Sequence, residues 1–159
     1  MKNLTTLLFL LLVFPILGQT ISPSFSQDAK LLTIGDSKRG YEAPTANVLL
    51  RVKLETKKNI VLFPEFEYAD LKEAYYRYSL NGGYKFGYKK ISATPYIGYG
   101  FIEHNGGSRG FSGGLDFSYN ISNRFTATIT NQATERTDLK GDIIKYSIFV
   151  GVEYKIHLK

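Results

Sequence analysis

The stretch from Tyr75 to Tyr88, YYRYSLNGGYKFGY, separates into two faces at the two-residue period of a β-strand. One face consists of Tyr76, Tyr78, Leu80, Gly82, Tyr84, Phe86 and Tyr88. The other consists of Tyr75, Arg77, Ser79, Asn81, Gly83, Lys85 and Gly87. The first face has rings at both ends and small or aliphatic groups between them. This distribution is typical of a strand that crosses a bilayer, with rings at the two headgroup levels.

The N-terminal segment, residues 1 to 18, has the layout of a secretory signal peptide. Lys2 supplies positive charge, the run 7–17 is almost uninterruptedly apolar, and the small Gly18 precedes Gln19 at a plausible cleavage point. A membrane-spanning helix is disfavoured because Pro15 interrupts a run that falls short of about 20 residues. The sequence therefore predicts an exported chain whose mature domain is 19–159.

The charge balance favours anionic lipid over nucleic acid as a partner. The chain has a net charge of +6, and removal of Lys2 with the signal leaves +5. Export makes nucleic acid an improbable partner, and the basic runs are only pairs such as Lys57-Lys58 and Lys89-Lys90. Outer-membrane lipid headgroups and lipopolysaccharide phosphates are the expected counter-charge. The absence of Cys excludes disulfides, a lipoprotein anchor, thiolate metal sites and Cys nucleophiles, and no cofactor is predicted.

The same alternation recurs along the mature chain and predicts eight strands joined as sequential hairpins. Besides 75–88, the predicted strands are 19–27, 46–55, 59–70, 91–104, 109–121, 125–135 and 143–158. The first is the least regular, and its extension through Leu32 and Ile34 stays open. Pro64 lacks a ladder donor and predicts a bulge, and no helical period is found. The predicted fold class is all-β, an eight-stranded antiparallel up-and-down transmembrane β-barrel.

Periodicity does not say which face points inward. An inward apolar face would give a soluble, lipocalin-like carrier, whereas an outward one gives a membrane barrel. The apolar face holds more ring volume than an eight-stranded lumen can contain, so we expect it to face lipid. The opposite face is mostly small and polar, and its charges should pair inside and near the rims. These predicted lumen charges are Arg51, Lys53, Glu65, Glu67, Arg77, Lys85, Asp116, Lys145, Glu153 and Lys155.

The signal-like N-terminus, the eight alternating strands and their aromatic ends resemble the OmpA/OmpX type of small outer-membrane β-barrel over essentially the whole mature chain. This resemblance implies a Gram-negative outer membrane, short turns facing the periplasm, and external loops at about 35–45, 70–73, 104–109 and 137–142. It also implies recognition of the last strand by the barrel-assembly machinery. In that family the last strand commonly ends in an aromatic residue, whereas here Tyr154, Ile156 and Leu158 are followed by Lys159.

A hydrolase-like pattern occurs within one predicted strand. Residues 110–114 read G-x-S-x-G, and Asp116 or Asp142 followed by His157 gives the chain order serine, acid, histidine. The motif requires a strand, a sharp turn and then a helix. Because it lies inside an alternating strand, we interpret it as a chance match.

A second enzyme hypothesis concerns His104 and Ser108, in a loop, with Asp116 on the following strand. The lipid A deacylase barrels resemble this chain in size, but their histidine and serine are two residues apart, whereas position 106 is Gly. No catalytic residue is therefore predicted. No metal site is predicted either, because His104 and His157 should fall near opposite ends of the barrel.

These observations favour a non-enzymatic outer-membrane barrel with a structural, adhesive or envelope-maintenance role. Arg77 with Asp116 or Glu153 could gate a porin-like pore, but a static polar plug fits a narrow lumen better. The alternatives that stay open are a lipid A-modifying barrel enzyme and a soluble lipocalin-like carrier. The sequence does not give the oligomeric state.

Overall fold

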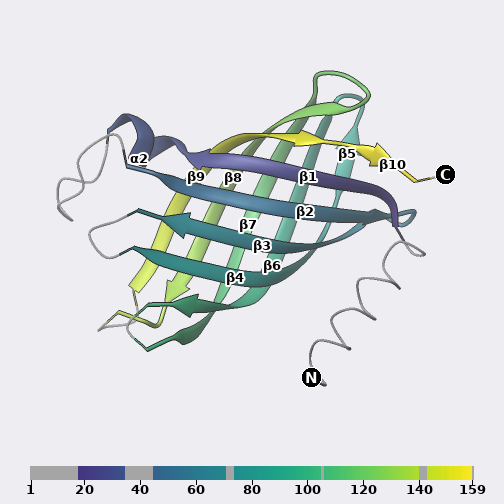
Figure 1. Ribbon diagram of the computed structural model, residues 1–159. Coiled ribbons are helices and arrows are strands. Elements are labelled where there is room, and N and C mark those ends of the chain that lie inside the picture. The colour runs from purple at the N-terminus through teal and green to yellow at the C-terminus, as the bar shows by residue number, and fades with distance from the viewer. Residues whose placement is uncertain (1–17, 35–44, 71–73, 105, 140–142, 159) are drawn as a thin grey trace.

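The fold is a single antiparallel sheet rolled into a barrel (Figure 1). The computed structural model describes residues 18–34, 45–70, 74–104, 106–139 and 143–158. Its strands are β1 (Gly18–Asp28), β2 (Asn47–Thr56), β3 (Ile60–Ala69), β4 (Tyr75–Tyr84), β5 (Phe86–Tyr88), β6 (Ile91–Glu103), β7 (Ser108–Asn120), β8 (Phe125–Arg136), β9 (Ile143–Tyr154) and β10 (Ile156–His157). One short helix, α2 (Ala29–Thr33), follows β1.

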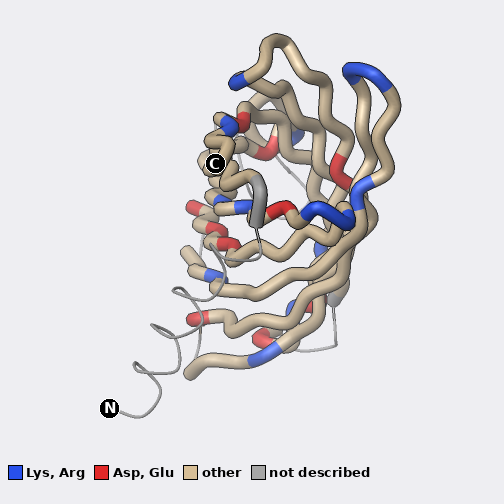
Figure 2. The backbone as a smooth tube through the Cα atoms, turned by 90° about the vertical axis from the view of Figure 1, so that its right-hand side faces the viewer, with Lys and Arg blue, Asp and Glu red and all other residues tan. Residues whose placement is uncertain are grey.

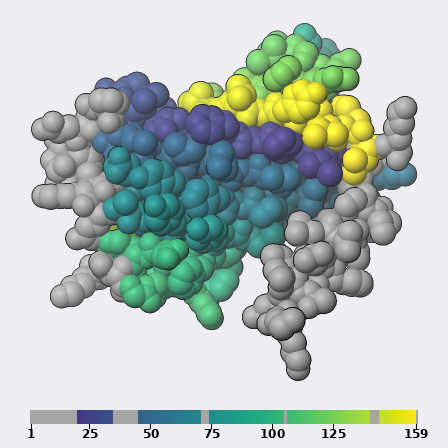
Figure 3. Space-filling view, viewed as in Figure 1, coloured from purple at the N-terminus to yellow at the C-terminus, as the bar shows by residue number. Residues whose placement is uncertain are grey.

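Each strand pairs with its neighbour in sequence, and β1 pairs with β9 to close the cylinder. Phe25 of β1, for example, lies opposite Val152 of β9. The short β5 and β10 continue β4 and β9 beyond Lys85 and Lys155, so the wall consists of eight strands. Figure 3 shows β1 to β4 side by side as one continuous wall. The predicted fold class is confirmed, and closure leaves no long sheet edge unpaired.

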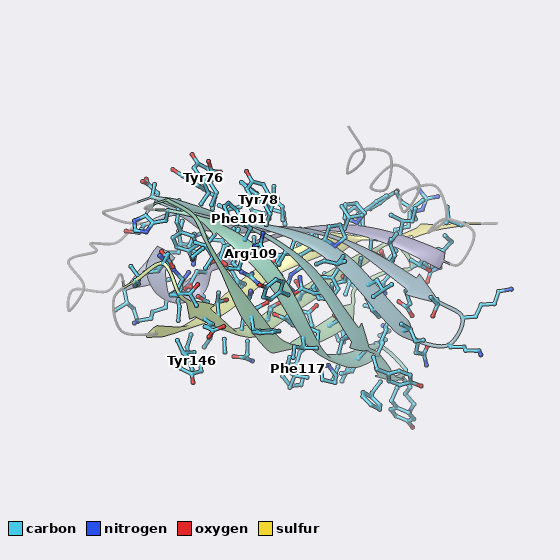
Figure 4. All side chains as sticks on the ribbon, turned by 90° about the horizontal axis from the view of Figure 1, so that it is seen from below. Tyr76, Tyr78, Phe101, Arg109, Phe117 and Tyr146 are labelled. Atoms are coloured by element: carbon cyan, nitrogen blue, oxygen red, sulfur yellow. The ribbon has the colours of Figure 1, made fainter. Side chains whose placement is uncertain are left out.

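The apolar face of every strand points outward, as the ring-volume argument predicted. Tyr78, Phe86, Phe117 and Ile148 are 50%, 60%, 43% and 49% exposed. In Figure 4, Phe117 and Tyr146 project away from the barrel wall. This arrangement is the opposite of that of a soluble carrier with an apolar interior, and it is the one that a lipid environment requires.

The two ends of the barrel differ. The connections after β1, β3, β6 and β8 lie at one end, which we call the loop end. The start of β1, the end of β10 and the connections after β2, β5 and β7 lie at the other, which we call the terminal end (Figure 1). Residues 35–44, 71–73 and 140–142 of the predicted external loops lie outside the described residues. The predicted signal peptide also lies outside the described residues, apart from Gly18, which begins β1. Cleavage of the signal peptide stays a prediction.

The possible extension of the first strand through Leu32 and Ile34 is wrong, because Asp28 starts a helix. One carboxylate oxygen of Asp28 accepts hydrogen bonds from the backbone N–H groups of Lys30 and Leu31 at 2.9 and 3.1 Å. An N-cap aspartate satisfies the first helical donors in this way. Among the described residues no helix is long and apolar enough to cross a membrane.

The bulge predicted at Pro64 is also wrong. The register between β3 and β4 is continuous on both sides of Pro64. Toward β2, the pairs Arg51–Glu65 and Leu54–Leu62 keep a single register, with two positions between them left unpaired. The missing N–H of proline therefore interrupts the ladder without an inserted residue.

If the outward face contacts lipid, its tolerance of charge should depend on depth. We expect Ile148→Arg, in the middle of β9, to lower the free energy of unfolding by about 2–4 kcal/mol, and Tyr88→Arg, at the terminal end, by about 0–1 kcal/mol. Urea unfolding after refolding into phospholipid vesicles measures both. Equal, small losses at the two positions would contradict lipid contact at Ile148.

Candidate functional site

The interior of the barrel is filled by charged and aromatic side chains that reach across from opposite walls. The inward positions of β6 and β7 include glycines, which make room for them. A Cβ atom at Gly98 would collide with the side chain of Asn81, and one at Gly114 with the hydroxyl end of Tyr96. The small wall residues and the large crossing residues are therefore complementary in volume.

Glu65 of β3 is the central acceptor of the network. Its Oε2 accepts from Arg51 Nε at 2.7 Å, and its Oε1 accepts from Arg77 Nη1 at 2.6 Å. Oε1 also accepts from Gln132 Nε2 at 3.0 Å and from the Ser79 hydroxyl at 3.2 Å. One fully buried carboxylate thus joins side chains of β2, β4 and β8 to β3.

Asp116 of β7 forms a second node nearer the terminal end. Lys53 Nζ lies 2.6 Å from Asp116 and 2.6 Å from Glu153 of β9. Arg51 Nη1 lies 3.2 Å from Asp116, and the hydroxyl of Thr130 on β8 also donates to it. This node therefore connects β2, β7, β8 and β9 across the lumen.

Glu67 of β3 forms a third node toward the loop end. Lys145 Nζ donates to its Oε1 at 2.7 Å, and the Tyr75 hydroxyl donates to the same oxygen at 2.5 Å. Arg77 Nη1 lies 3.9 Å from Oε2. Because Arg77 also contacts Glu65, this node continues the central one and joins β9 to β3 and β4.

The structure places eight of the ten predicted lumen charges in the buried interior and two at the terminal rim. The buried cations are Arg51, Lys53, Arg77 and Lys145, and the buried anions are Glu65, Glu67, Asp116 and Glu153. At the rim, half-exposed Lys85 pairs with Glu55 at 2.6 Å, and half-exposed Lys155 donates to Asn120 at 2.5 Å. The buried set of four cations and four anions sums to zero, which limits the cost of removing these charges from water.

The ion-pair partners of Arg77 differ from those that the hypothesis of a gated pore named. Arg77 pairs with Glu65 rather than with Asp116 or Glu153. Its Nη2 donates to the hydroxyl of Ser112, the serine of the G-x-S-x-G pattern. That serine is buried within β7 and no helix follows it, so the hydrolase context is absent at this position.

Sequence reasoning missed the aromatic residues of the network. The guanidinium of Arg51 lies over the rings of Phe63 and Tyr96, 5.2 and 5.1 Å from their centroids, and donates to the Tyr96 hydroxyl at 2.9 Å. Cation–π contact of this kind partly compensates a desolvated guanidinium. Both rings lie on inward positions, so the strand parity that identified the charges could have identified them too.

The lumen is nearly solid at the terminal end. A cavity of about 10 Å³ there is lined by side chains that include Lys53, Glu55, Lys85, Glu153 and Lys155. This volume is about enough for one water molecule. The arrangement can therefore hold opposite walls together, and it leaves little open space in this cavity.

A separate polar cluster lies at the loop end. His104 Nδ1 lies 2.8 Å from Asp138 Oδ2, and the two carboxylate oxygens of Asp138 accept from Arg136 Nε and Nη2 at 2.6 Å each. The acid beside His104 is therefore Asp138, whereas Asp116, which the enzyme hypothesis considered, lies in the lumen. His157 is at the terminal end, 3.3 Å from Thr20. The described residues contain no group of three or more potential metal ligands.

The geometry defines the class of fold: a small outer-membrane β-barrel of eight strands. Among solved structures, the chain is similar to the outer membrane protein Ail of Yersinia pestis, with 12% identity, 87% of this chain and 99% of that chain covered, and a TM-score of 0.59. It is similar to the N-terminal β-barrel domain of Pseudomonas aeruginosa OprF, with 11% identity, 87% and 98% coverage, and a TM-score of 0.59. A de novo designed transmembrane β-barrel gives 11% identity, 87% and 96% coverage, and a TM-score of 0.57.

At these identities the likeness shows the fold alone. No protein-family model and no curated protein matches the chain. The resemblance to small eight-stranded outer-membrane barrels is confirmed by the closed cylinder and by these structures together.

Loss of the central carboxylate should be costly because it leaves two buried guanidinium groups without their main partner. We expect Glu65→Gln to lower the free energy of unfolding by about 3–5 kcal/mol. Lys85→Gln breaks a partly exposed pair at the rim and should cost no more than about 1 kcal/mol. Urea unfolding in lipid vesicles measures both variants. A loss for Glu65→Gln as small as that for Lys85→Gln would contradict a central role for Glu65.

The loop-end cluster should weaken in acid. Burial by itself raises the pKa of Asp138, but hydrogen bonds from Arg136 and the charge of its guanidinium outweigh burial and hold that pKa below its usual range. The stabilisation is then fully present above the unfolded value of about 4, and is lost as pH falls through the lower folded pKa. The N–H of Leu139 donates to Arg136 O at 3.1 Å, so its hydrogen-exchange protection reports on the cluster.

We expect protection at Leu139, corrected for intrinsic exchange, to be constant from pH 7 to 5 and to fall below about pH 4. In Asp138→Asn, protection should be low throughout and independent of pH. An unchanged acid-dependent loss in that variant would show that another group is responsible.

Proposed function

We propose that the protein is a non-conducting, non-catalytic barrel of the outer membrane that serves a structural, adhesive or envelope-maintenance role. The observation that carries this proposal is the charge-neutral network that fills the lumen, centred on Glu65. A barrel whose interior is occupied by paired side chains has no room to pass solutes. What it can offer is a rigid wall in the membrane and the surfaces at its two ends.

The outward surface supports a place in the outer membrane. Large apolar residues are exposed on every wall strand, with rings near both ends, which is the surface that a bilayer stabilises and water does not. The signal-like segment of residues 1 to 18 supports export, with removal of the segment and assembly by the barrel-assembly machinery as part of the proposal.

An adhesive role would use the loop end. Ail of Yersinia pestis, which shares the fold, is described as the attachment invasion locus protein. In this chain the cluster of His104, Asp138 and Arg136 would fix the connection after β8 against the end of β6. A fixed rim is better suited to binding a partner than a freely moving one, because less ordering is needed on contact.

The alternative is a lipid A-modifying enzyme, and one observation favours it. His104 Nδ1 and Asp138 Oδ2 are 2.8 Å apart, a distance at which an acid can orient a catalytic histidine. However, both oxygens of Asp138 also accept from Arg136, and the nearest candidate nucleophile in sequence, Ser108, is four residues from His104 rather than two. The cluster is therefore better explained as a structural contact that holds the connection after β8 against the end of β6.

Two measurements test the proposal. In planar bilayers the purified protein should give no steady unitary conductance, because the lumen cavity at the terminal end holds about one water. Lipid A from cells that make the protein should have the same mass spectrum as lipid A from cells that lack it.

The outcomes that contradict the proposal are distinct. Steady conductance would show that the plug opens in a membrane and would indicate a pore. A change in lipid A that disappears in His104→Ala but persists in His157→Ala would support the enzyme. His157 is a suitable control because it lies at the opposite end of the barrel.

A further inference from the structure

The three short turns at the terminal end present a set of cations to the outside. We call this set the basic collar, and its members are Lys57, Lys58, Lys89, Lys90 and Arg124. All five are exposed, and none of the turn residues at 57–59, 89–90 and 121–124 is acidic. Figure 2 looks onto this end and shows the blue segments on its projecting turns.

The acidic residues near this end are already paired and face the lumen. Glu55 lies 2.6 Å from Lys85, and Glu153 lies 2.6 Å from Lys53. Glu55 therefore neutralises the rim residue Lys85, and Glu153 neutralises the interior residue Lys53. The described part of the loop end is different, because its exposed residues include acidic Asp70 and Glu103. Exposed Lys30 and Arg109 balance these two acids, so among the described exposed turn residues the excess of positive charge lies at the terminal end.

The collar lies beside the rings that mark the edge of the apolar band. Lys89 Nζ lies 5.1 Å from the ring centroid of Tyr88, and Arg124 Nη1 is 3.4 Å from the Tyr154 hydroxyl oxygen. Phe125, next to Arg124, contacts Tyr154 with 5.2 Å between ring centroids. Because such rings sit at the headgroup level of a bilayer, the neighbouring cations lie at the depth of the lipid phosphates.

The turn between β5 and β6 presents its lysines at a conformational cost. Lys89 has φ +54°, in the left-handed region, where asparagine or glycine is the preferred residue of a two-residue hairpin turn. The comparable left-handed position in the turn after β2 is occupied by Asn59, with φ +61°. A side chain kept at a strained position is a reason to look for a function there.

We propose that the basic collar binds the phosphate groups of anionic phospholipids in the leaflet that faces the terminal end. The collar matches that leaflet in charge and in depth, and its cations come from three turns spread along the rim. The proposal rests on the membrane-spanning fold and not on the proposed function, so either can fail without the other.

Native mass spectrometry of the detergent-solubilised full chain tests the proposal, with dioleoyl phosphatidylglycerol and dioleoyl phosphatidylcholine as competing probes. A cation near an anionic lipid surface is worth on the order of fivefold in affinity. We expect the protein to retain phosphatidylglycerol in preference to phosphatidylcholine at low salt. The variant Lys57→Ser/Lys58→Ser/Lys89→Ser/Lys90→Ser should lose about tenfold or more of that preference.

Matched variants separate lipid binding from a structural role. Lys89→Asn removes a charge but suits the left-handed position, so the preference should fall while the urea midpoint stays equal or rises. Lys30→Ser/Arg109→Ser removes two cations at the loop end and should leave the preference unchanged. Heat-modifiable migration on a gel confirms that each variant is folded.

Several results would overturn the proposal. If the quadruple variant keeps the full preference for phosphatidylglycerol, the lipid binds elsewhere. If Lys30→Ser/Arg109→Ser loses as much of the preference as the quadruple variant, the preference depends on the net charge of the protein and not on the collar. Inorganic phosphate that displaces phosphatidylglycerol completely at equal concentration would indicate a free-phosphate site rather than a lipid site.

Discussion

The structure depends on the pairing of buried charges inside a narrow cylinder. Glu65 accepts from Arg51 and Arg77 at the centre of the lumen, and each of those guanidinium groups reaches a second carboxylate. An isolated charge there would be very costly, whereas a set that sums to zero and in which every charge has an oppositely charged partner is better tolerated. Glu65 links the neighbouring strands β2, β3 and β4, whereas the contact of Arg51 with Asp116 reaches across the lumen to β7. The network therefore connects strands around the barrel and occupies its lumen with paired side chains.

The outer face of the barrel is apolar, in contrast to the charged lumen, because the acyl chains of lipid offer no hydrogen bonds. The backbone groups of the wall are satisfied between strands, and closure through β1 and β9 satisfies the groups that an open sheet would expose. The wall can then carry apolar residues outward without penalty. Pro64 is tolerated in this wall because it has no N–H group that needs a partner. It interrupts the pairing of β3 with β2, but the register of the two strands is the same on both sides of it.

Strand alternation allowed the fold to be predicted, because a two-residue period assigns each side chain to one of two faces. The volume of the rings then indicated which face points outward. Eight of the ten predicted lumen charges are buried, whereas buried Arg136 was missed. Alternation did not identify the pairing of Arg77 with Glu65, although the two residues lie on the adjacent strands β4 and β3. It could not predict contacts such as Lys145–Glu67, since partners across a barrel depend on the stagger of strands that are distant in sequence. The helix after β1 was missed because its signal is a single capping residue, Asp28, and not a period.

The pairing of charges in the lumen determines how much net charge lies elsewhere on the barrel. The chain has a net charge of +6, yet its buried lumen charges cancel, so the excess must lie outside the lumen. Five exposed cations of the terminal end belong to the collar, and the acidic groups nearest to them are paired with Lys85 and Lys53. Because the lumen charges neutralise one another, they do not compensate the positive charge of the collar. Surplus carboxylates in the lumen would have weakened that field, so the pairing of the lumen charges also preserves the positive charge of the terminal end.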